Sequence, residues 1–381
     1  MKKLIVLFSA VAALAACSKN EVVPAVSGEN MEISYKVAPR TKAEADPKAF
    51  NTDNVFASWA YYLPKGKSWE TDSKDAQIYF GEESAHGVKI SYDKNKEVWK
   101  NQTNSYYWPK EGNLTFFAYS LNSDFLTDKL GTDTHFYCTK NESQYGICGA
   151  LNLDTHPNTD FLVADIAKDK TANETAYKFN GVPTLFKHKL SRVKFAVKKK
   201  SDYPGATITL NSITFKKLVN YMVYNQYKIN KDGSITPDSI THTILDKTPR
   251  SDQEYTKTDF EVSSSTAFDP VPDANEVRYI YIPQNFKDEI ATIEVKYTVT
   301  LKEGISETYT KTLKVKDIFD SWEIGKRYTF NLIFSLDEIN WAPAVGDWED
   351  EIKNIDVVTG EVKPADSSIP ADGETTTDEQ F

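Results

Sequence analysis

Short segments in which apolar and polar residues alternate, separated by Pro, Gly, Asn and Asp, are the feature that most constrains this fold. Residues Met31–Val37 read Met-Glu-Ile-Ser-Tyr-Lys-Val, and Pro39 follows them. Successive side chains of a β-strand point to opposite faces, so alternation with a period of two indicates a half-buried strand. Residues 55–62 are a longer apolar run that ends before Pro64, which is typical of a fully buried strand. The first part of the chain therefore predicts β structure.

The same pattern recurs over most of the sequence. A strand–turn–strand unit is expected over residues 106–119, and a hairpin over 291–315 with its turn at residues 302–305. Residues 317–322 are the segment most typical of a short helix or helical turn. Tyr, Phe and Trp make up 13% of the chain, and aromatic residues favour strands. Further strands are expected at residues 161–165, 185–197, 207–210, 213–215, 277–282 and 328–336.

The length and the turn signals predict two domains. At about 150 residues per domain the chain corresponds to two domains, and many short strands with few helical stretches favour β-sandwiches. The turn cluster Ser201–Gly205 is the expected boundary. We therefore expect an all-β chain with β-sandwich domains at residues 31–200 and 201–348. Residues 349–381 are expected to hold a last weak strand and an acidic tail, whose composition is typical of disorder.

The N-terminus has the layout of an export signal. Two lysines and a short apolar stretch precede Leu14-Ala15-Ala16-Cys17. This tetrapeptide resembles the lipobox of bacterial lipoproteins, which predicts cleavage between Ala16 and Cys17 and attachment of lipid to Cys17. The apolar stretch is too short for a membrane-spanning helix, which needs about 20 residues. We expect a signal peptide at residues 1–16, a tether at 17–30, and membrane anchoring through acyl chains such as palmitate.

Charge and motifs argue against nucleic-acid binding and catalysis. The net charge is −10, and no basic stripe interleaved with aromatic residues occurs. None of the five histidines lies at metal-ligand spacing, and the sequence has no Cys-x-x-Cys, nucleophile elbow, phosphate-binding loop or dinucleotide fingerprint. We therefore expect no cofactor, no metal site and no enzymatic activity. A pair of glycosidase carboxylates stays open, because the fold rather than a motif would create it.

Cys138 and Cys148 remain once Cys17 is assigned to lipid. An even number of cysteines in an exported protein is compatible with a disulfide. A bridge between these two residues would contribute about 3 kcal/mol to stability by the chain-entropy estimate. The alternative is two half-buried thiols, and both interpretations stay open on the sequence alone.

Several segments in a fixed order along the chain point to one family. The most specific is Trp322–Ile339, which reads Trp-Glu-Ile-Gly-Lys-Arg-Tyr-Thr-Phe-Asn-Leu-Ile-Phe-Ser-Leu-Asp-Glu-Ile and is followed by Val345-Gly-Asp-Trp348. The others, in addition to the lipobox and the arginine after the first strand, are Tyr106–Tyr119, Thr159–Asp165, Leu185–Phe195 and Tyr281–Gln284. In this order the segments resemble the fimbrillins, and the resemblance covers most of residues 1–350. It implies a lipoprotein precursor with two tandem transthyretin-like β-sandwich domains.

The resemblance also implies a mechanism of assembly. In fimbrillins, a protease specific for Arg or Lys removes the lipidated N-terminus together with the first strand. The loss opens an apolar groove, and a strand of the neighbouring subunit fills it, so that backbone hydrogen bonds and alternating side chains hold the pilus together. The implied partners are other fimbrillin subunits and a host or bacterial surface ligand. The implied location is the outer membrane of the cell, and the fimbrium after maturation.

Carried over to this sequence, the displaced strand is Met31–Val37, with Ile33, Tyr35 and Val37 facing inward. The donor strand would come from the C-terminal stretch, with Ile355 and Val357 as its pocket residues.

The maturation cut would follow Arg40, between Arg40 and Thr41. Cleavage after Lys42 is the alternative, and an ordinary loop arginine is a further interpretation of Arg40.

A surface lipoprotein that binds glycans is the alternative function. Trp108, Trp341 and Trp348 could stack on sugars, whereas the competing interpretation is that these side chains fill the core.

Overall fold

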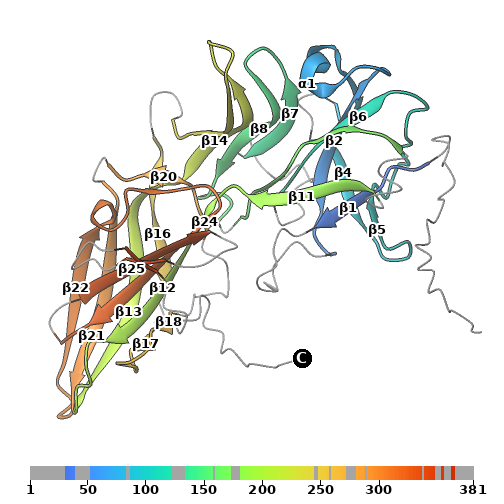
Figure 1. Ribbon diagram of the computed structural model, residues 1–381. Helices are drawn as coiled ribbons and strands as arrows, with labels where there is room; N and C mark the ends of the chain where they lie inside the picture. Colours follow the sequence, from blue (N-terminus) through green and yellow to red (C-terminus); the bar gives the residue numbers. More distant parts are fainter. Residues whose placement is uncertain are drawn as a thin grey trace, which may run out of the picture.

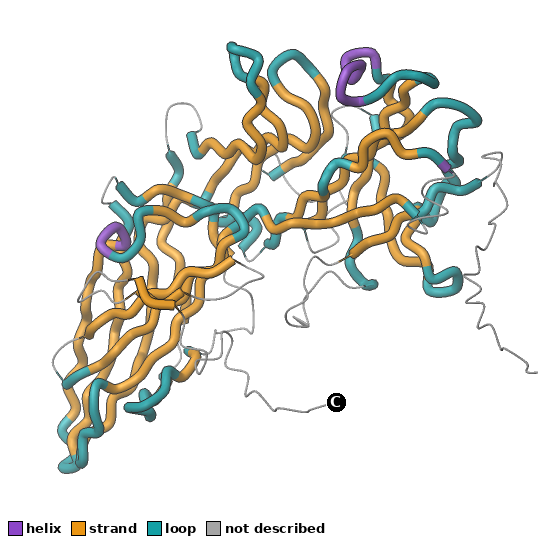
Figure 2. The backbone as a smooth tube through the Cα atoms, in the orientation of Figure 1, coloured by secondary structure: helices purple, strands orange, loops and turns teal. Residues whose placement is uncertain are grey.

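The structure is a computed structural model in which strands dominate, so the prediction of an all-β chain is confirmed (Figure 1, Figure 2). Among the part of the chain that it describes, no helix combines the length and apolar character needed to cross a membrane. The described residues are 31–38, 52–82, 86–121, 134–157, 159–172, 181–243, 248–256, 259–271, 280–287, 290–336, 339–347, 353–355 and 362–364.

Seven strands of the N-terminal half form a ring in which each strand pairs with two neighbours. In order around the ring, they are β1 (Tyr35–Ala38), β5 (Val98–Lys100), β4 (Val88–Asp93), β2 (Phe56–Leu63), β6 (Asn113–Ser120), β9 (Leu162–Ala164) and β11 (Val182–His188). The pairing of β2 with β6 closes the ring, from Leu63 opposite Asn113 to Ala57 opposite Tyr119. Two more strands, β3 (Gln77–Phe80) and β10 (Ala167–Lys170), pair with β2 and β6 beside the ring.

The two faces of β2 and β6 contribute to two different cores. Phe56 and Phe116 lie on the inner face and join a buried cluster with Trp99 and Phe186. The alternate side chains of the same strands, among them Trp59, lie in a second cluster. Burial on both faces explains why β2 and β6 read as continuous apolar runs in the sequence.

A second sheet packs on the outer face of β2 and β6 (Figure 1). Its strand order is β15 (Ile235–Thr241), β14 (Tyr221–Ile229), β8 (Gln144–Asn152) and β7 (His135–Lys140). The predicted boundary between residues 200 and 201 does not separate the cores, because β14 pairs with β8 and Tyr224 belongs to the same cluster as Trp59. The N-terminal part is therefore a ring with an added sheet, more elaborate than the single sandwich expected for residues 31–200.

The C-terminal part has its core between two further sheets. Phe195 and Phe330 come from one sheet, and Phe215 and Tyr297 come from the other. The first sheet contains β12 (Ser191–Lys199), β24 (Lys326–Phe334), β25 (Ile339–Asp347), β26 (Lys353–Ile355) and β27 (Val362–Pro364), with β18 (Asp269–Pro270) and β19 (Ile280–Tyr281) beside β12. The second contains β16 (Arg250–Thr256), β13 (Ala206–Val219), β21 (Thr292–Leu301) and β22 (Ser306–Lys314), with β17 (Phe260–Glu261) beside β13.

Several expected elements differ in detail. The single strand expected over residues 185–197 is the end of β11 and most of β12, because Lys189 and Leu190 interrupt the pairing and the chain passes from one core to the other. The two strands expected at 207–215 are one long strand, β13. The helical turn expected at 317–322 lies earlier, as a 3-10 helix at Val315–Asp317, and β23 (Ser321–Trp322) follows it and pairs with β20 (Gln284–Asn285).

Candidate functional site

The segment formed by residues 31–38, called here the N-terminal segment, completes the ring. β1 pairs in parallel with β11, from Tyr35 opposite Val182 to Ala38 opposite Leu185. On its other edge, Tyr35 lies opposite Trp99 of β5. The residues before β1 continue these bonds, because the Ile33 N–H donates to the Tyr106 carbonyl at 2.7 Å. The segment is thus held by backbone hydrogen bonds on both edges.

Alternate side chains of the N-terminal segment fill the inside of the ring. Ile33 is 4% exposed and Tyr35 is 3% exposed, while Val37 is partly buried at the margin of the same cluster. The Tyr35 ring lies edge-on to Phe56 at 5.3 Å and to Phe116 at 5.9 Å between ring centroids. Burying a large apolar side chain stabilises a fold by about 1.5–3 kcal/mol. The segment is therefore an integral part of this core.

The Tyr35 hydroxyl makes a buried hydrogen bond inside the ring. It donates to the Ser58 Oγ at 2.9 Å, and that hydroxyl donates in turn to the Phe117 carbonyl at 3.2 Å. Burial raises the pKa of Tyr35 well above its ordinary value, since the phenolate would be desolvated there. The tyrosine is therefore a neutral donor at every physiological pH.

Glu32 joins the N-terminal segment to β5 through charge. The Lys100 Nζ donates to both carboxylate oxygens, at 2.8 and 3.0 Å, and the Ser105 hydroxyl donates to one of them at 2.9 Å. The Lys96 Nζ lies 3.8 Å from the same carboxylate. Burial alone would raise the pKa of Glu32, but the hydrogen bonds from Lys100 and Ser105 and the lysine charges outweigh burial, so the pKa is lowered.

Gly181 allows β11 to approach the N-terminal segment closely. Its φ of +129° lies in a region that side chains disfavour, and an added Cβ would lie 2.8 Å from the Tyr35 carbonyl carbon and 3.0 Å from the Lys36 nitrogen. The obstructing atoms are backbone atoms, which cannot move without shifting β1. Glycine at this position therefore allows β1 to pack this closely against β11.

Removal of the N-terminal segment would change both the backbone and the core of the ring. β5 and β11 would each lose a pairing partner along one edge. Phe56 and Phe116 would lose the Tyr35 ring that covers them. Unpaired strand edges beside exposed apolar side chains are a template for another strand. The N-terminal segment is therefore an extended peptide held between β5 and β11 against the core of the ring.

The other predicted site residues do not belong to the N-terminal segment. Ile355 ends β26, which pairs with β25 through Lys353 opposite Val345. The remaining ones lie outside the described residues: Ala16, Cys17, Arg40, Thr41, Lys42 and Val357. The predicted cut after Arg40 falls shortly beyond Ala38, where β1 ends.

Cys138 and Cys148 lie on the two neighbouring strands of the β7–β8 hairpin. Cys138 is opposite Ile147, and Cys148 is opposite Tyr137. Directly opposed residues share a face and successive residues alternate, so the two sulfurs point to opposite faces of the hairpin. Both are buried thiols, and burial raises the pKa of Cys148 to about 12. This register favours the two-thiol alternative over the disulfide.

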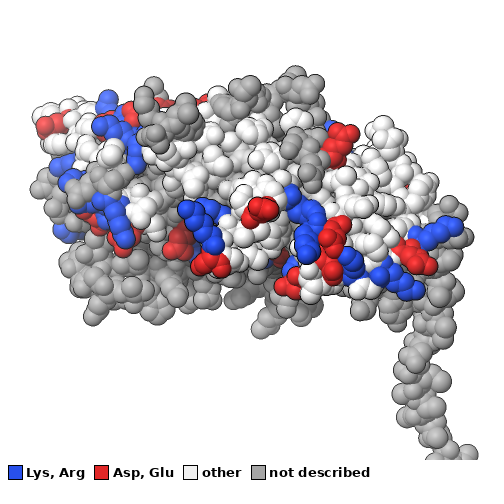
Figure 3. Space-filling view, turned by 90° about the horizontal axis from the view of Figure 1, so that it is seen from above, with Lys and Arg blue, Asp and Glu red and all other residues white. Residues whose placement is uncertain are grey.

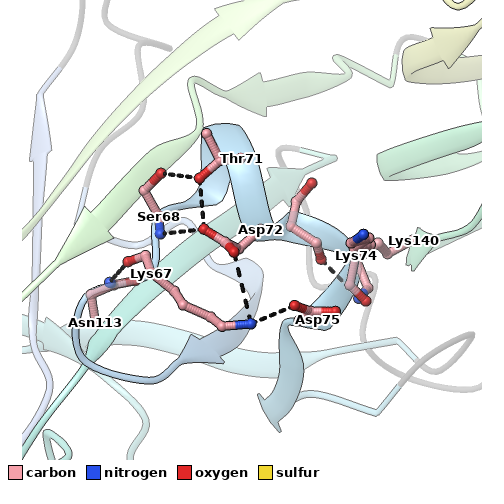
Figure 4. A network of polar contacts seen from close by, with 9 residues as sticks. Lys67, Ser68, Thr71, Asp72, Lys74, Asp75, Asn113 and Lys140 are labelled. Atoms are coloured by element: carbon pink, nitrogen blue, oxygen red, sulfur yellow. Dashed lines mark hydrogen bonds and ion pairs between the residues drawn. The ribbon is translucent and has the colours of Figure 1, made fainter.

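A polar network fixes the turn at the far end of β2 (Figure 4). The turn contains α1 (Trp69–Asp72) and the 3-10 helix η1 (Ser73–Asp75). Lys67 bonds to Asp75 at 2.5 Å and lies 3.7 Å from Asp72. Lys140 of β7 donates to three carbonyl oxygens at the end of η1. The charges in this network hold backbone groups, so the network is structural.

The aromatic residues considered for sugar stacking are poorly placed for it where the structure describes them. Trp108 is 4% exposed and packs on Phe116 at 5.6 Å, as expected for a core residue. The side chain of Trp341 and the whole of Trp348 lie outside the description.

The histidine at the end of β11 is paired with a buried carboxylate. His188 Nδ1 lies 3.0 Å from the buried carboxylate of Asp160, a pairing that joins β11 to the residues just before β9. Within the described part of the chain, no group of His, Cys, Asp and Glu could hold a metal ion. On the face seen in Figure 3, positive and negative side chains are interspersed rather than gathered into a field of one sign.

Comparison with known proteins gives a consistent result. A family model described as fimbrillin-like matches residues 41–348. The fold is similar to that of a fimbrial protein from Bacteroides vulgatus, with a TM-score of 0.60, 16% identity, and coverage of 84% of this chain and 100% of that chain. A "putative cell adhesion protein" from Bacteroides uniformis has a TM-score of 0.47, 12% identity, and coverage of 83% and 99%. No curated protein matches.

Proposed function

The chain belongs to the fimbrillin-like family, and from this premise we propose that it is a fimbrial subunit or fimbrillin-like surface adhesin assembled by strand exchange. The family consists of fimbrial and adhesion proteins and is not an enzyme family. A surface-exposed location and assembly with other subunits, or adhesion to a surface, follow for this chain. In this proposal the two parts of the chain correspond to the transthyretin-like domains that the family resemblance implies.

The observation that supports the proposal best is the position of the N-terminal segment in the ring. It contributes Ile33 and Tyr35 to the core and a pairing edge to each of β5 and β11. The chain enters this position from outside the matched family region, which starts at residue 41. A segment that is both terminal and central to a core is suited to removal and replacement.

Export and maturation supply the order of events. The chain would be exported as a lipoprotein, cut between Ala16 and Cys17, and anchored to the outer membrane by the lipid on Cys17. Cleavage after Arg40 or Lys42 would then detach the lipid and the N-terminal segment together. The C-terminal stretch of a neighbouring subunit, with Ile355 and Val357 as pocket residues, would enter the vacated groove by β-augmentation. A host or bacterial surface ligand would be the partner of the finished polymer.

Limited proteolysis tests the proposal on the precursor made without lipid, as a Cys17→Ser variant. Brief trypsin treatment is expected to cut after Arg40 or Lys42, as read by mass spectrometry, and the trimmed protein is expected to form chains of subunits in electron micrographs. A matched control replaces Arg40, Lys42 and the nearby Lys48 by Ala, which should keep residues 31–38 attached and the protein monomeric under the same treatment. If the trimmed protein stays monomeric at high concentration, assembly by strand exchange is wrong for this chain.

A further inference from the structure

The groove has a charge that its present occupant neutralises. Lys100 has only 12% of its side chain exposed, and Glu32 of the N-terminal segment receives two hydrogen bonds from it. Lys96 lies on the same side of Glu32. When the N-terminal segment leaves, both lysines lose this carboxylate.

Asp93 is the other carboxylate whose charge acts on Lys100. Its Oδ1 accepts the backbone N–H groups of Asn95 and Lys96, which hold this carboxylate in the β4–β5 turn. The departure of Glu32 removes two charge-assisted hydrogen bonds from the Lys100 ammonium, and such bonds are stronger than those between neutral groups. An incoming strand that supplies a carboxylate at this place would therefore be favoured over one that does not.

The C-terminal stretch of this chain has the matching chemistry. Residues 349–381 contain ten Asp and Glu and only two Lys. In the N-terminal segment, Glu32 directly precedes the first pocket residue, Ile33. The same order of an acid followed by an aliphatic residue occurs three times in the C-terminal stretch, at Glu351-Ile352, Asp356-Val357 and Glu361-Val362.

We propose that Lys100 makes the groove selective for a strand that carries a carboxylate at the position of Glu32, and that the occupant is the acidic C-terminal stretch of a second copy of this chain. This inference rests on the proposed strand exchange and adds the rule by which the groove selects its strand. The apolar pockets set which side chains fit the core. Lys100 fixes the register of a strand that presents Asp356 or Glu361, because a displacement by one residue there would present an uncharged side chain.

Peptide competition tests the inference. Trypsin-trimmed protein is allowed to assemble in the presence of a peptide with the sequence of residues 31–38, or of the same peptide with Glu32→Gln. The Glu32→Gln peptide is expected to inhibit about tenfold more weakly, which corresponds to about 1.4 kcal/mol. In a Lys100→Met protein the two peptides should inhibit equally. A Lys94→Met protein is the matched control, since Lys94 lies in the turn between β4 and β5 and pairs with Asp53 at 3.5 Å rather than with Glu32.

A second pair of peptides tests the occupant. A peptide of residues 349–366 is expected to inhibit the wild-type protein about tenfold more strongly than one in which Glu351, Asp356 and Glu361 are amides. Equal inhibition by the acid and amide forms of both peptides would overturn the selectivity of Lys100 while leaving strand exchange intact. Selectivity with the first pair alone would overturn the C-terminal stretch as occupant. Failure of the trimmed protein to assemble, together with absence of binding by every peptide, would instead refute the proposed function.

Discussion

Replacing Tyr35 by Ala should lower the free energy of unfolding of the ring more than any other single substitution by Ala in the N-terminal segment. The side chain is 3% exposed and contacts Phe56 and Phe116. Truncation of a buried aromatic residue to Ala costs about 3–5 kcal/mol. The lost hydrogen bond to Ser58 adds about 1 kcal/mol, because Ser58 keeps the Phe117 carbonyl as its acceptor. We expect a loss of about 4–6 kcal/mol in the free energy of unfolding of the ring.

Two further variants separate the contribution of the Tyr35 hydroxyl from that of its ring and supply a surface control. Tyr35→Phe keeps the ring contacts and should cost about 1 kcal/mol, the value of the hydroxyl hydrogen bond. Lys36→Ala changes the exposed neighbour in the same strand and should stay within about 0.5 kcal/mol of the wild type. If the Ala variant does not fold, the unfolding free energy of Tyr35→Phe can still be measured.

Urea unfolding followed by pulsed hydrogen exchange and mass spectrometry measures the effect. Peptides from β2 and β6 report on the ring, and peptides from β21 and β24 report on the other core, whose buried cluster does not include Tyr35. The midpoint for β2 and β6 should fall, and the midpoint for β21 and β24 should stay unchanged. A change below about 1 kcal/mol for Tyr35→Ala, comparable to a surface substitution, would refute the reasoning that the segment is part of the core.

Three further predictions follow from the same structure. The folded-state pKa of Glu32 is lowered from its ordinary value of 4.5, so the stability that the ionised carboxylate contributes is present above pH 4.5 and is lost as pH falls through the lowered pKa. The urea midpoint of the ring should therefore be lower at pH 3 than at pH 6. The Glu32→Gln variant should show a smaller difference between these two pH values. Gly181→Ala should weaken the packing of β1 against β11 by about 1–3 kcal/mol through strain and should speed trypsin cleavage after Arg40. Gly233→Ala is the control for a positive φ alone, because its added Cβ has nothing within 4 Å. Iodoacetamide at pH 8 should leave Cys138 and Cys148 unlabelled in the native protein and label both after denaturation without reductant; recovery of a disulfide-linked peptide would contradict the register of β7 and β8.

The sequence carried most of the information about single strands. The alternation of Met31–Val37 identified the side chains that lie inward, and the apolar run at residues 55–62 identified β2 as a buried strand. The ordered motifs also pointed to the correct family. These features depend on the side-chain period of one strand, so they are visible without knowledge of its neighbours.

Other features were not predicted, because the pattern of one segment does not show which segment it pairs with. No strand was predicted for residues 135–152, yet they form the hairpin β7–β8 with its turn at residues 141–143. The strand β14 alternates clearly in the sequence, and only its pairing with β8 shows that it belongs to the N-terminal core. A domain boundary placed at a turn cluster missed this return of the chain.

What the sequence by itself determined is therefore the class of the fold, the family, and the faces of individual strands such as β1. What only the tertiary structure decided is that β1 closes a ring between β5 and β11, that Gly181 provides its close contact, that Glu32 meets Lys100, and that the two cysteines face apart. The physical reason is that a strand's own residues set which side chains are buried, whereas its partners are set by hydrogen bonding and packing between segments far apart in the chain, which no local pattern specifies.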